Sequence, residues 1–268
     1  NPNHPEAHNN LGITLQELGR FKESEVILKK AITLKPNNEK FYNNLANSLQ
    51  KIGKLEEAKA SYRKAIILKP DYPEAHNNLG AILQELYLFK EAETSCRQAI
   101  VLKPDYNQAH SNKNFHLNYS STWSPLLIYQ QHLEFEKQFG GLEVRTQLNL
   151  PIKKLPGDKL RIGYVSGDFK KHSVAYFFDP LLQYHNANAV ETFCYYNDHV
   201  IDATTKRLMS LSDHWRSIHK ILDTDVVNLI KNDKIDILVD LSGHTAKNRL
   251  LVFAQKPAPI QATWLGYP

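Results

Sequence analysis

Cysteine is scarce in this chain, and its two cysteines, Cys96 and Cys194, lie far apart in apolar surroundings. Such usage favours buried thiols in a reducing compartment over a disulfide or a metal pair, so we expect a cytoplasmic protein. No apolar run is long enough to cross a membrane, and the opening NPNHPEAHNN is not a signal peptide. Because the sequence starts inside a repeat, we expect it to be part of a longer protein.

Motifs that hold phosphate groups are also missing. There is no Gly-x-Gly-x-x-Gly and no phosphate-cradling GK[ST], which disfavours a dinucleotide site or a P-loop. The net charge of +5 is mild, and the lysines recur at the ends of repeats rather than in one block, so nucleic acid is not an expected partner. His110, His116 and His132 have no cysteine or acidic cluster at ligand spacing, so we expect no metal site.

What the chain does contain is a repeat with a period of 34 residues, marked by Pro36, Pro70 and Pro104. Small residues recur where two antiparallel helices must approach closely: Gly12, Ala46 and Gly80 in the first helices, then Ser24, Ala58 and Ala92 with Ala31, Ala65 and Ala99 in the second. This pattern resembles the tetratricopeptide repeat. Because one repeat cannot bury its own apolar face, the pattern predicts a stacked α-solenoid over residues 1–106.

One polar position of the first helix is the same in successive repeats. Asn10, Asn44, Asn78 and Asn112 are again spaced by 34 residues. On a curled stack they would form a ladder along the concave groove. An asparagine amide offers a donor and an acceptor, so the ladder can pair with the peptide bonds of an extended chain. The alternative is a polar position that favours packing between repeats, and we expect peptide binding.

A fourth unit starts at Asp105 and departs from the pattern. Lys113 stands where the other repeats have leucine, and Asn114 replaces the small residue, which puts the packing of this junction in question. Helical periodicity resumes over 126–139, followed by two glycines and a proline-bearing stretch. We interpret residues 107–158 as a degenerate repeat, a capping helix and a linker.

Beyond Lys159 the period changes to alternating strands and helices. Apolar runs of strand length cover 160–165, 192–196, 235–241 and 260–265, with a short extra strand considered at 214–218. Helical patterns lie between them at 173–184, 202–211, 224–231 and 249–253. This order predicts an α/β lobe over 159–268 with a mostly parallel sheet covered by helices on both faces.

Three glycine-containing turns should meet at the carboxyl edge of that sheet. Ser166-Gly167-Asp168 follows the first strand, 242–245 (SGHT) follows the IDILVDL strand, and 266–268 (GYP) follows the last one. Right-handed crossovers bring the carboxyl ends of parallel strands together, where such sheets place their ligands. His172 lies just beyond the first turn. The sequence therefore predicts a ligand site at this edge.

Three motifs follow the repeats: GYVSGDFKKHSVAYF, DLSGHTAKNRL and KPAPIQATWLGYP. The combination resembles the protein O-linked N-acetylglucosamine transferases and their bacterial and SPINDLY-type relatives. The resemblance implies a GT-B glycosyl transferase, of which this chain holds the repeats and the first Rossmann-like lobe. It also implies transfer of N-acetylglucosamine from UDP-GlcNAc to serine or threonine hydroxyls of proteins, without a cofactor and with the donor bound mainly by a second lobe.

The resemblance also places individual residues. His172 matches the family histidine that lines the active site, and Asp168 matches the acidic residue of the same loop. The sugar and acceptor cleft would be lined by Gly243, His244, Thr245, Leu265, Gly266 and Pro268. In the family, the substrate peptide runs along the asparagine ladder into this cleft.

The residue chemistry agrees with that assignment. Histidine titrates near neutral pH and can accept or relay the hydroxyl proton, while an aspartate can orient an imidazole or serve as the base. Without the resemblance, His172 would be a loop histidine bonded to the backbone, and Asp168 a helix cap or turn residue. Which of the two handles the proton stays open. We expect His199, His214 and His219 to be structural.

Two other functions remain open at this point. The HSV and GHTA motifs also occur in SPINDLY-type relatives, which transfer fucose from a guanosine diphosphate donor, so the resemblance leaves the sugar undecided. If the gene product ended at Pro268, the chain would be a peptide-binding scaffold without transferase activity.

Overall fold

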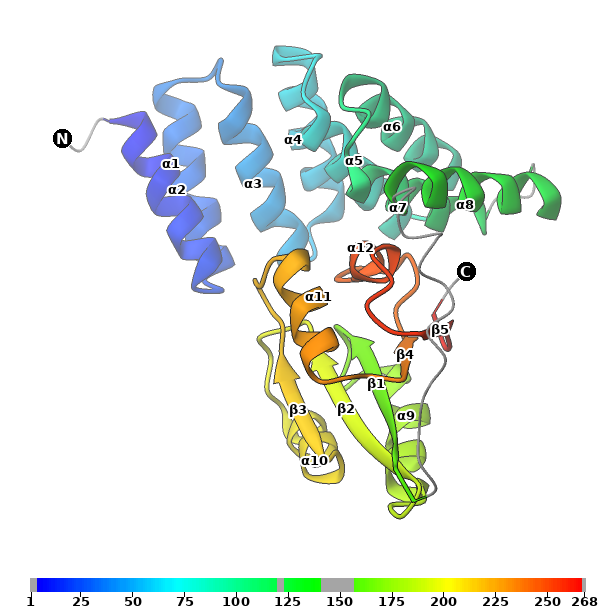
Figure 1. Ribbon diagram of the computed structural model, residues 1–268. Coiled ribbons are helices and arrows are strands. Elements are labelled where there is room, and N and C mark those ends of the chain that lie inside the picture. The colour runs from blue at the N-terminus through cyan, green and yellow to red at the C-terminus, as the bar shows by residue number, and fades with distance from the viewer. Residues whose placement is uncertain (1–3, 120–122, 141–156, 267–268) are drawn as a thin grey trace. The chain divides into compact units, whose positions relative to one another are not determined.

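The structure is a computed structural model that describes residues 4–119, 123–140 and 157–266. They form two compact units, Asn1–Ile128 and Tyr129–Pro268, which are drawn in Figure 1 and are treated separately below. The boundary falls within helix α8 (Pro125–Phe139). The three-part division that the sequence suggests, with boundaries after residues 106 and 158, stays a prediction.

The first unit is a stack of helical hairpins, as the repeat predicts. Successive helices pack against each other along the chain, and they lie side by side in Figure 1. Their bounds are α1 Pro5–Glu17, α2 Phe21–Leu34, α3 Glu39–Lys51, α4 Leu55–Leu68, α5 Pro73–Glu85, α6 Phe89–Leu102 and α7 Asn107–Leu117. The second helix of each of the three full repeats ends two residues before its marker proline, whose missing N–H could not continue the helix.

Close approach explains the small residues of the repeats. A Cβ atom on Gly12 would lie 2.6 Å from Leu28 Cγ, and one on Gly80 would lie 2.6 Å from Cys96 Sγ. The Ser24 hydroxyl donates to the Gly12 carbonyl at 2.8 Å, which satisfies a polar group at a fully buried position. The prediction that small residues let the paired helices touch is confirmed.

The atypical fourth repeat is still packed as a helix. Helix α7 packs against α6, and Lys113 and Asn114 are both buried there, at 6% and 0% exposure. The two departures from the repeat pattern therefore change the chemistry of the junction without preventing α7 from joining the stack.

The second unit contains a five-stranded parallel sheet in the order β3-β2-β1-β4-β5. Its strands are β1 Leu160–Ser166, β2 Val190–Tyr196, β3 His214–Ser217, β4 Ile237–Asp240 and β5 Ile260–Thr263. The helices between them are α9 Ser173–Tyr184, α10 Ala203–Leu211, α11 Asp223–Asn232 and α12 Leu250–Ala254. The predicted α-solenoid and parallel α/β lobe are both confirmed, and the short extra strand exists as β3.

Each face of the sheet carries its own apolar core. Along β1 and β2, Val165, Phe193 and Tyr195 pack with α11 and α12, while Tyr164, Cys194 and Tyr196 pack with α9 and α10. The alternation follows from the two-residue period of a strand. Helices cover both faces of the sheet, and the loops after β1, β2, β4 and β5 follow the carboxyl ends of its parallel strands at one edge (Figure 1).

Candidate functional site

The loops after β1, β4 and β5 touch at the carboxyl edge of the sheet. A Cβ atom on Gly266 would lie 2.5 Å from the Gly243 backbone nitrogen, so only glycine allows this approach. A Cβ atom on Gly167 would lie 2.8 Å from Lys247 Cβ, on the loop after β4. The structure thus brings together the turns that the sequence singled out, although Pro268 lies outside the described residues.

His172 and Asp168 lie side by side in the loop between β1 and α9. His172 is the N-cap residue of α9, and its Nδ1 atom accepts a hydrogen bond from the Val174 N–H at 3.3 Å. The same Nδ1 atom is 3.9 Å from Asp168 Oδ2, and the two side chains are 43% and 17% exposed. The capping role that the sequence offered as an alternative for Asp168 belongs instead to His172.

The loop after β4 is held by the buried carboxylate of Asp240. Its oxygens accept hydrogen bonds from the Ser242 N–H at 3.1 Å, the Gly243 N–H at 2.8 Å and the Thr263 hydroxyl at 3.1 Å. Burial raises the pKa of the Asp240 carboxyl, and these three donors oppose that rise. Asp240 therefore ties the loop after β4 to β5.

His244 and Thr245 belong to this loop, and His244 faces the protein interior. His244 is 6% exposed, and its Nε2 atom lies 3.1 Å from His132 Nδ1 on α8. The Phe135 ring meets the His244 ring edge to face at 4.9 Å. The Thr245 hydroxyl donates to the Ser242 carbonyl at 2.7 Å. These contacts give both side chains a structural role in the loop, and the sequence did not predict that His132 would contact His244.

Leu265 has a positive φ of 62° and packs partly against the apolar core shared by α9 and α10. That conformation is uncommon for a residue with a side chain. It turns the chain from β5 toward Gly266, which then meets Gly243.

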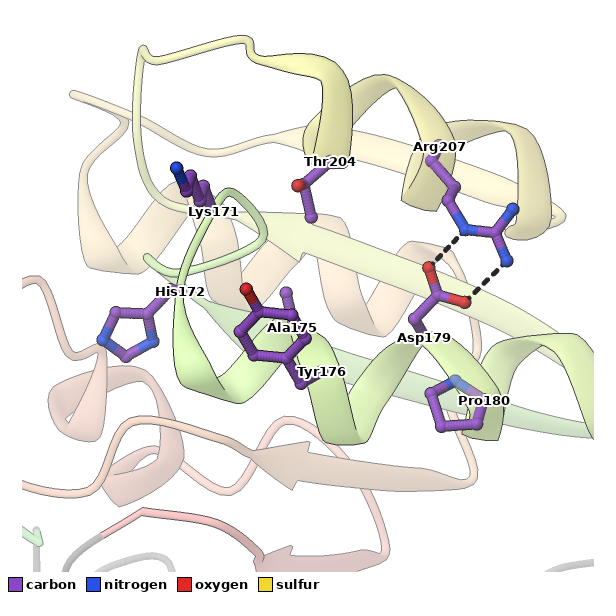
Figure 2. Close-up of a pocket in the computed structure, with 8 residues that line it drawn as sticks. All are labelled: Lys171, His172, Ala175, Tyr176, Asp179, Pro180, Thr204 and Arg207. Carbon is purple, nitrogen blue, oxygen red and sulfur yellow. Dashed lines mark hydrogen bonds and ion pairs between the residues drawn. The ribbon is translucent and has the colours of Figure 1, made fainter.

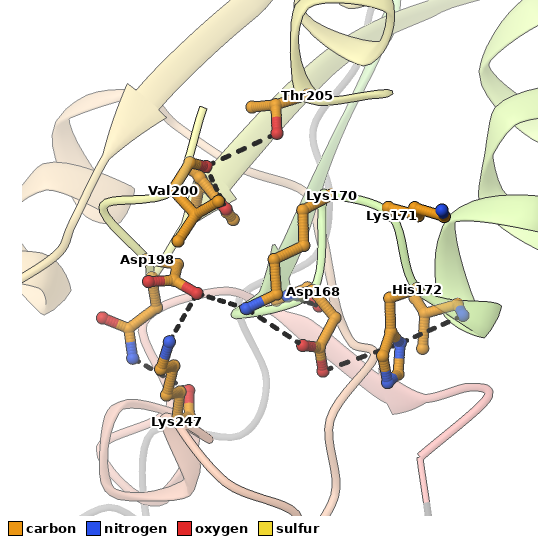
Figure 3. Close-up of polar contacts among 12 residues, drawn as sticks. Asp168, Lys170, Lys171, His172, Asp198, Val200, Thr205 and Lys247 are labelled. Atoms are coloured by element: carbon orange, nitrogen blue, oxygen red, sulfur yellow. Dashed lines mark hydrogen bonds and ion pairs between the residues drawn. The ribbon is translucent and has the colours of Figure 1, made fainter. Parts of the chain in front are cut away.

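A fourth loop, which its sequence does not single out, also reaches this edge. Asp198 follows β2 and its carboxylate is fully buried. One of its oxygens accepts hydrogen bonds from the ammonium groups of Lys170 and Lys247, and the other accepts from the His199 N–H at 2.7 Å (Figure 3). The detectable signal was an acidic residue two positions after the predicted strand 192–196, but this turn has no glycine.

Through these ion pairs, Asp198 connects the loops after β1, β2 and β4. Burial alone would raise the pKa of its carboxyl, but the hydrogen bonds from Lys170, Lys247 and the His199 N–H outweigh that effect and hold the pKa below its usual range. Burial would likewise lower the pKa of the Lys170 ammonium, and its hydrogen bond to Asp198 reverses the direction. Lys170 Nζ is also 4.0 Å from Asp168 Oδ1.

A pocket of about 250 Å³ opens beside His172, between α9 and α10. Figure 2 shows the Tyr176 ring near His172 and the Arg207 guanidinium paired with Asp179 at the other end. The bidentate pair has Nε and Nη2 of Arg207 at 2.5 and 2.9 Å from the two oxygens of Asp179. Tyr176 is 73% exposed, so the pocket offers an aromatic surface next to the imidazole.

Several other histidines contact neighbouring side chains or backbone groups. His110 lies 2.9 Å from the Pro104 carbonyl, and His214 lies 2.8 Å from Glu191 at the amino end of the sheet. The His199 and His219 rings are 5.3 Å apart. His116 is buried against Gln84. Within the described ranges, no group of three or more histidine, cysteine, aspartate or glutamate side chains could hold a metal ion.

The ladder asparagines of the first unit are linked from repeat to repeat. The amide nitrogens of Asn44, Asn78 and Asn112 donate to Asn9, Asn43 and Asn77 of the preceding repeat at 2.8, 3.3 and 2.9 Å. Asn9, Asn43 and Asn77 are buried, whereas the ladder positions keep part of their surface exposed and Asn10 is exposed. The ladder therefore has a packing role, whether or not it also binds peptide.

Comparison with known proteins bears on both units. Residues 144–268 match the family profile of glycosyl transferase family 41, and residues 5–38, 27–60 and 51–86 match tetratricopeptide repeat profiles. A solved O-GlcNAc transferase mutant from Thermobaculum terrenum matches 98% of this chain with a TM-score of 0.86 and 33% sequence identity. The chain thus combines a lobe that matches glycosyl transferase family 41 with tetratricopeptide repeats. Its repeats and α/β lobe share the architecture of the O-GlcNAc transferases.

Curated relatives agree with this family. The probable UDP-N-acetylglucosamine–peptide N-acetylglucosaminyltransferase SPINDLY of Hordeum vulgare is 40% identical over 157 residues, which is 57% of this chain and 16% of that protein. The UDP-N-acetylglucosamine–peptide N-acetylglucosaminyltransferase of Caenorhabditis elegans is 40% identical over 115 residues, 42% of this chain and 10% of that protein. The chain spans half of the Thermobaculum chain. In the described part of the chain, no helix is both long and apolar enough to cross a membrane.

Proposed function

We propose that this chain is part of a protein O-glycosyl transferase that moves N-acetylglucosamine from UDP-GlcNAc to serine and threonine hydroxyls of proteins. In that reaction the hydroxyl oxygen bonds to the anomeric carbon of the sugar. The bond from this carbon to the diphosphate breaks, UDP leaves, and the hydroxyl proton passes to a base. One observation supports this proposal most directly: the Asp168–His172 pair lies at the carboxyl edge of the sheet. The chain around this pair is similar to an O-GlcNAc transferase over 98% of its length.

In this proposal Asp168 and His172 stand on the acceptor side of the site. Gly243 and Gly266 let the backbone of two loops come close to the sugar, since neither carries a side chain. Leu265 precedes Gly266 at this approach, and His244 and Thr245 stabilise the loop after β4. By its position in the sequence, Pro268 belongs to the same proposed cleft. Protein substrates would lie along the ladder of the repeats. Two buried free cysteines support a cytoplasmic location for the protein.

The test must separate loss of chemistry from loss of the helix cap. His172→Asn keeps a good N-cap residue but removes the imidazole, whereas His172→Ala removes both. A protein containing this chain is given UDP-GlcNAc and a serine-containing peptide, and the product is weighed by mass spectrometry. We expect His172→Asn to slow transfer by about 100-fold or more, the range of a positioned acid–base or donor group.

His214→Gln is the matched control, because His214 lies at the opposite, amino end of the sheet. It should leave the rate unchanged. Unchanged transfer by His172→Asn would remove His172 from the proposed site.

A fucosyl transferase is the second candidate, since several relatives are of the SPINDLY type. Offering GDP-fucose beside UDP-GlcNAc decides between the sugars by the mass that the peptide gains. Peptide binding without transfer of either sugar would instead support a scaffold.

A further inference from the structure

The position of Lys170 points to a role that deepens the proposed function at the same site. We infer that Lys170, anchored by the buried Asp198, is a positioning residue that keeps His172 as a hydrogen-bond donor rather than a proton acceptor.

The helix cap fixes the tautomer of His172. A backbone N–H can only donate, so the bond from Val174 N–H to Nδ1 requires an unprotonated Nδ1 atom. In the neutral ring the proton then sits on Nε2. The imidazole is 43% exposed, which leaves Nε2–H open to a ligand. A ring in this state donates to a substrate oxygen, and the hydroxyl proton must go to another base.

Asp168 competes for the same Nδ1 atom. Its Oδ2 atom is 3.9 Å away, and a protonated Nδ1 would form a charge-assisted hydrogen bond with this carboxylate. Such bonds are roughly twice as strong as neutral ones, so an undisturbed Asp168 would draw a proton onto Nδ1 and break the cap. The two arrangements exclude each other, because Nδ1 cannot accept from Val174 and donate to Asp168 at once.

Lys170 opposes that competition. Its ammonium is 4.0 Å from Asp168 Oδ1 and hydrogen-bonded to Asp198, so it draws the Asp168 charge away from the ring (Figure 3). The anchor is firm because Asp198 is fully buried and also bonded to Lys247. The side chains of Lys247, Asp198, Lys170 and Asp168 alternate in charge along three loops, and the series ends beside the neutral ring of His172.

Other charges near the ring do not replace Lys170. The Lys171 backbone N–H donates to Asp202 at 2.8 Å, and no ion pair of the Lys171 ammonium is found in the described part of the chain. Arg207 and Asp179 line the neighbouring pocket but neutralise each other. Lys171→Met is therefore a matched control, since it removes the same charge one residue away.

The experiment is ¹⁵N NMR of the histidine-labelled chain above neutral pH, with the His172 signals assigned by their loss in His172→Asn. Nitrogen chemical shifts separate protonated from unprotonated ring nitrogens. The parent, Lys170→Arg and Lys171→Met should show the proton on Nε2. Lys170→Met should move it to Nδ1, and hydrogen exchange of the Val174 amide should become roughly fivefold faster as the cap is lost. Asp198 keeps Lys247 as a partner in this variant, so folding is preserved.

Asp198→Asn is the second variant: it leaves the Lys170 ammonium free to pair with Asp168 alone, so the proton should stay on Nε2. A parent with the proton on Nδ1 would overturn the inference. So would an unchanged His172 tautomer in Lys170→Met, or a proton on Nδ1 in Asp198→Asn. None of these readings needs turnover, so they stand apart from the transfer assay: absence of transfer with the expected shifts would remove the proposed function and leave the inference intact.

Discussion

The buried imidazole of His116 should make the stability of the first unit depend on pH. His116 is 1% exposed, with Nε2 2.8 Å from Gln84 Oε1 and Nδ1 3.8 Å from Cys96 Sγ. Burial lowers the pKa of its imidazole from 6.5 to about 4. Between these values the unfolded chain binds a proton that the folded chain does not. Stability should therefore fall as the pH drops through that window, by up to about 3 kcal/mol.

Denaturant unfolding at about pH 7.5 and about pH 5 tests this linkage. His116→Phe removes the titrating group, so the difference in unfolding free energy between the two pH values should shrink. His110→Gln serves as a comparison, since His110 bonds a carbonyl at the edge of the same helix. An imidazole of His116 that titrates near 6.5 by NMR would contradict the argument.

Single residues also show where the sequence was not informative. Pairing of His132 with His244 joins positions 112 apart in the sequence, and no local pattern reports such a contact. The cap on α9 was not predictable, because Asp168 is the residue type that usually caps helices. Asp198 was not predictable in the same way, because its turn contains no glycine. Asp168 and His172 were found because they follow the first strand of the lobe and match a family motif.

At the scale of elements, the contact between the loops after β4 and β5 depends on Gly266. In Gly266→Ala the new Cβ atom would lie 2.5 Å from the Gly243 nitrogen and 2.8 Å from the Ser242 carbonyl carbon. Both are backbone atoms, so the loops must separate. We expect a loss of about 1–3 kcal/mol in stability, as for other overpacked sites, and weaker transfer. Thermal unfolding followed by tryptophan fluorescence measures the first effect.

Ser242→Ala is the control for that substitution. The Ser242 hydroxyl is buried, and it has no hydrogen-bond partner within the described ranges. Removing it from the same loop should not lower stability, because no hydrogen bond is lost. Equal stability of Gly266→Ala and the parent would show that the loops can part without cost.

Most helices and strands could be predicted, because the period and the length of their apolar patterns match those of the observed elements. The predicted helix 173–184 has the bounds of α9, and the strand patterns at 160–165 and 192–196 lie within β1 and β2. The apolar run 235–241 extends beyond β4, Ile237–Asp240, because Ile235 and Leu241 continue the two buried cores beyond the ends of the strand. Strand ends depend on pairing between distant segments, which apolar patterns do not record.

At the scale of the whole chain, the asparagine ladder can have two roles, packing between repeats and peptide binding, and an experiment must distinguish them. Each ladder amide donates to a buried asparagine of the preceding repeat, which supports packing. The same side chains keep exposed surface on successive repeats, which supports peptide binding. A substitution of the ladder alone loses both functions and cannot distinguish them.

The hydrogen bonds between the ladder asparagines and the buried asparagines supply a control that distinguishes peptide binding from packing. Asn78→Ala with Asn112→Ala, and Asn43→Ala with Asn77→Ala, break the same two hydrogen bonds between repeats, but only the first pair removes ladder side chains. Both should lose about 1 kcal/mol of stability per bond. Affinity for an extended serine-containing peptide, measured by calorimetry, should fall roughly thirtyfold in the first pair, since two hydrogen bonds to the peptide are lost. It should change little in the second. If both double variants lost peptide affinity equally, the ladder would have a packing role alone.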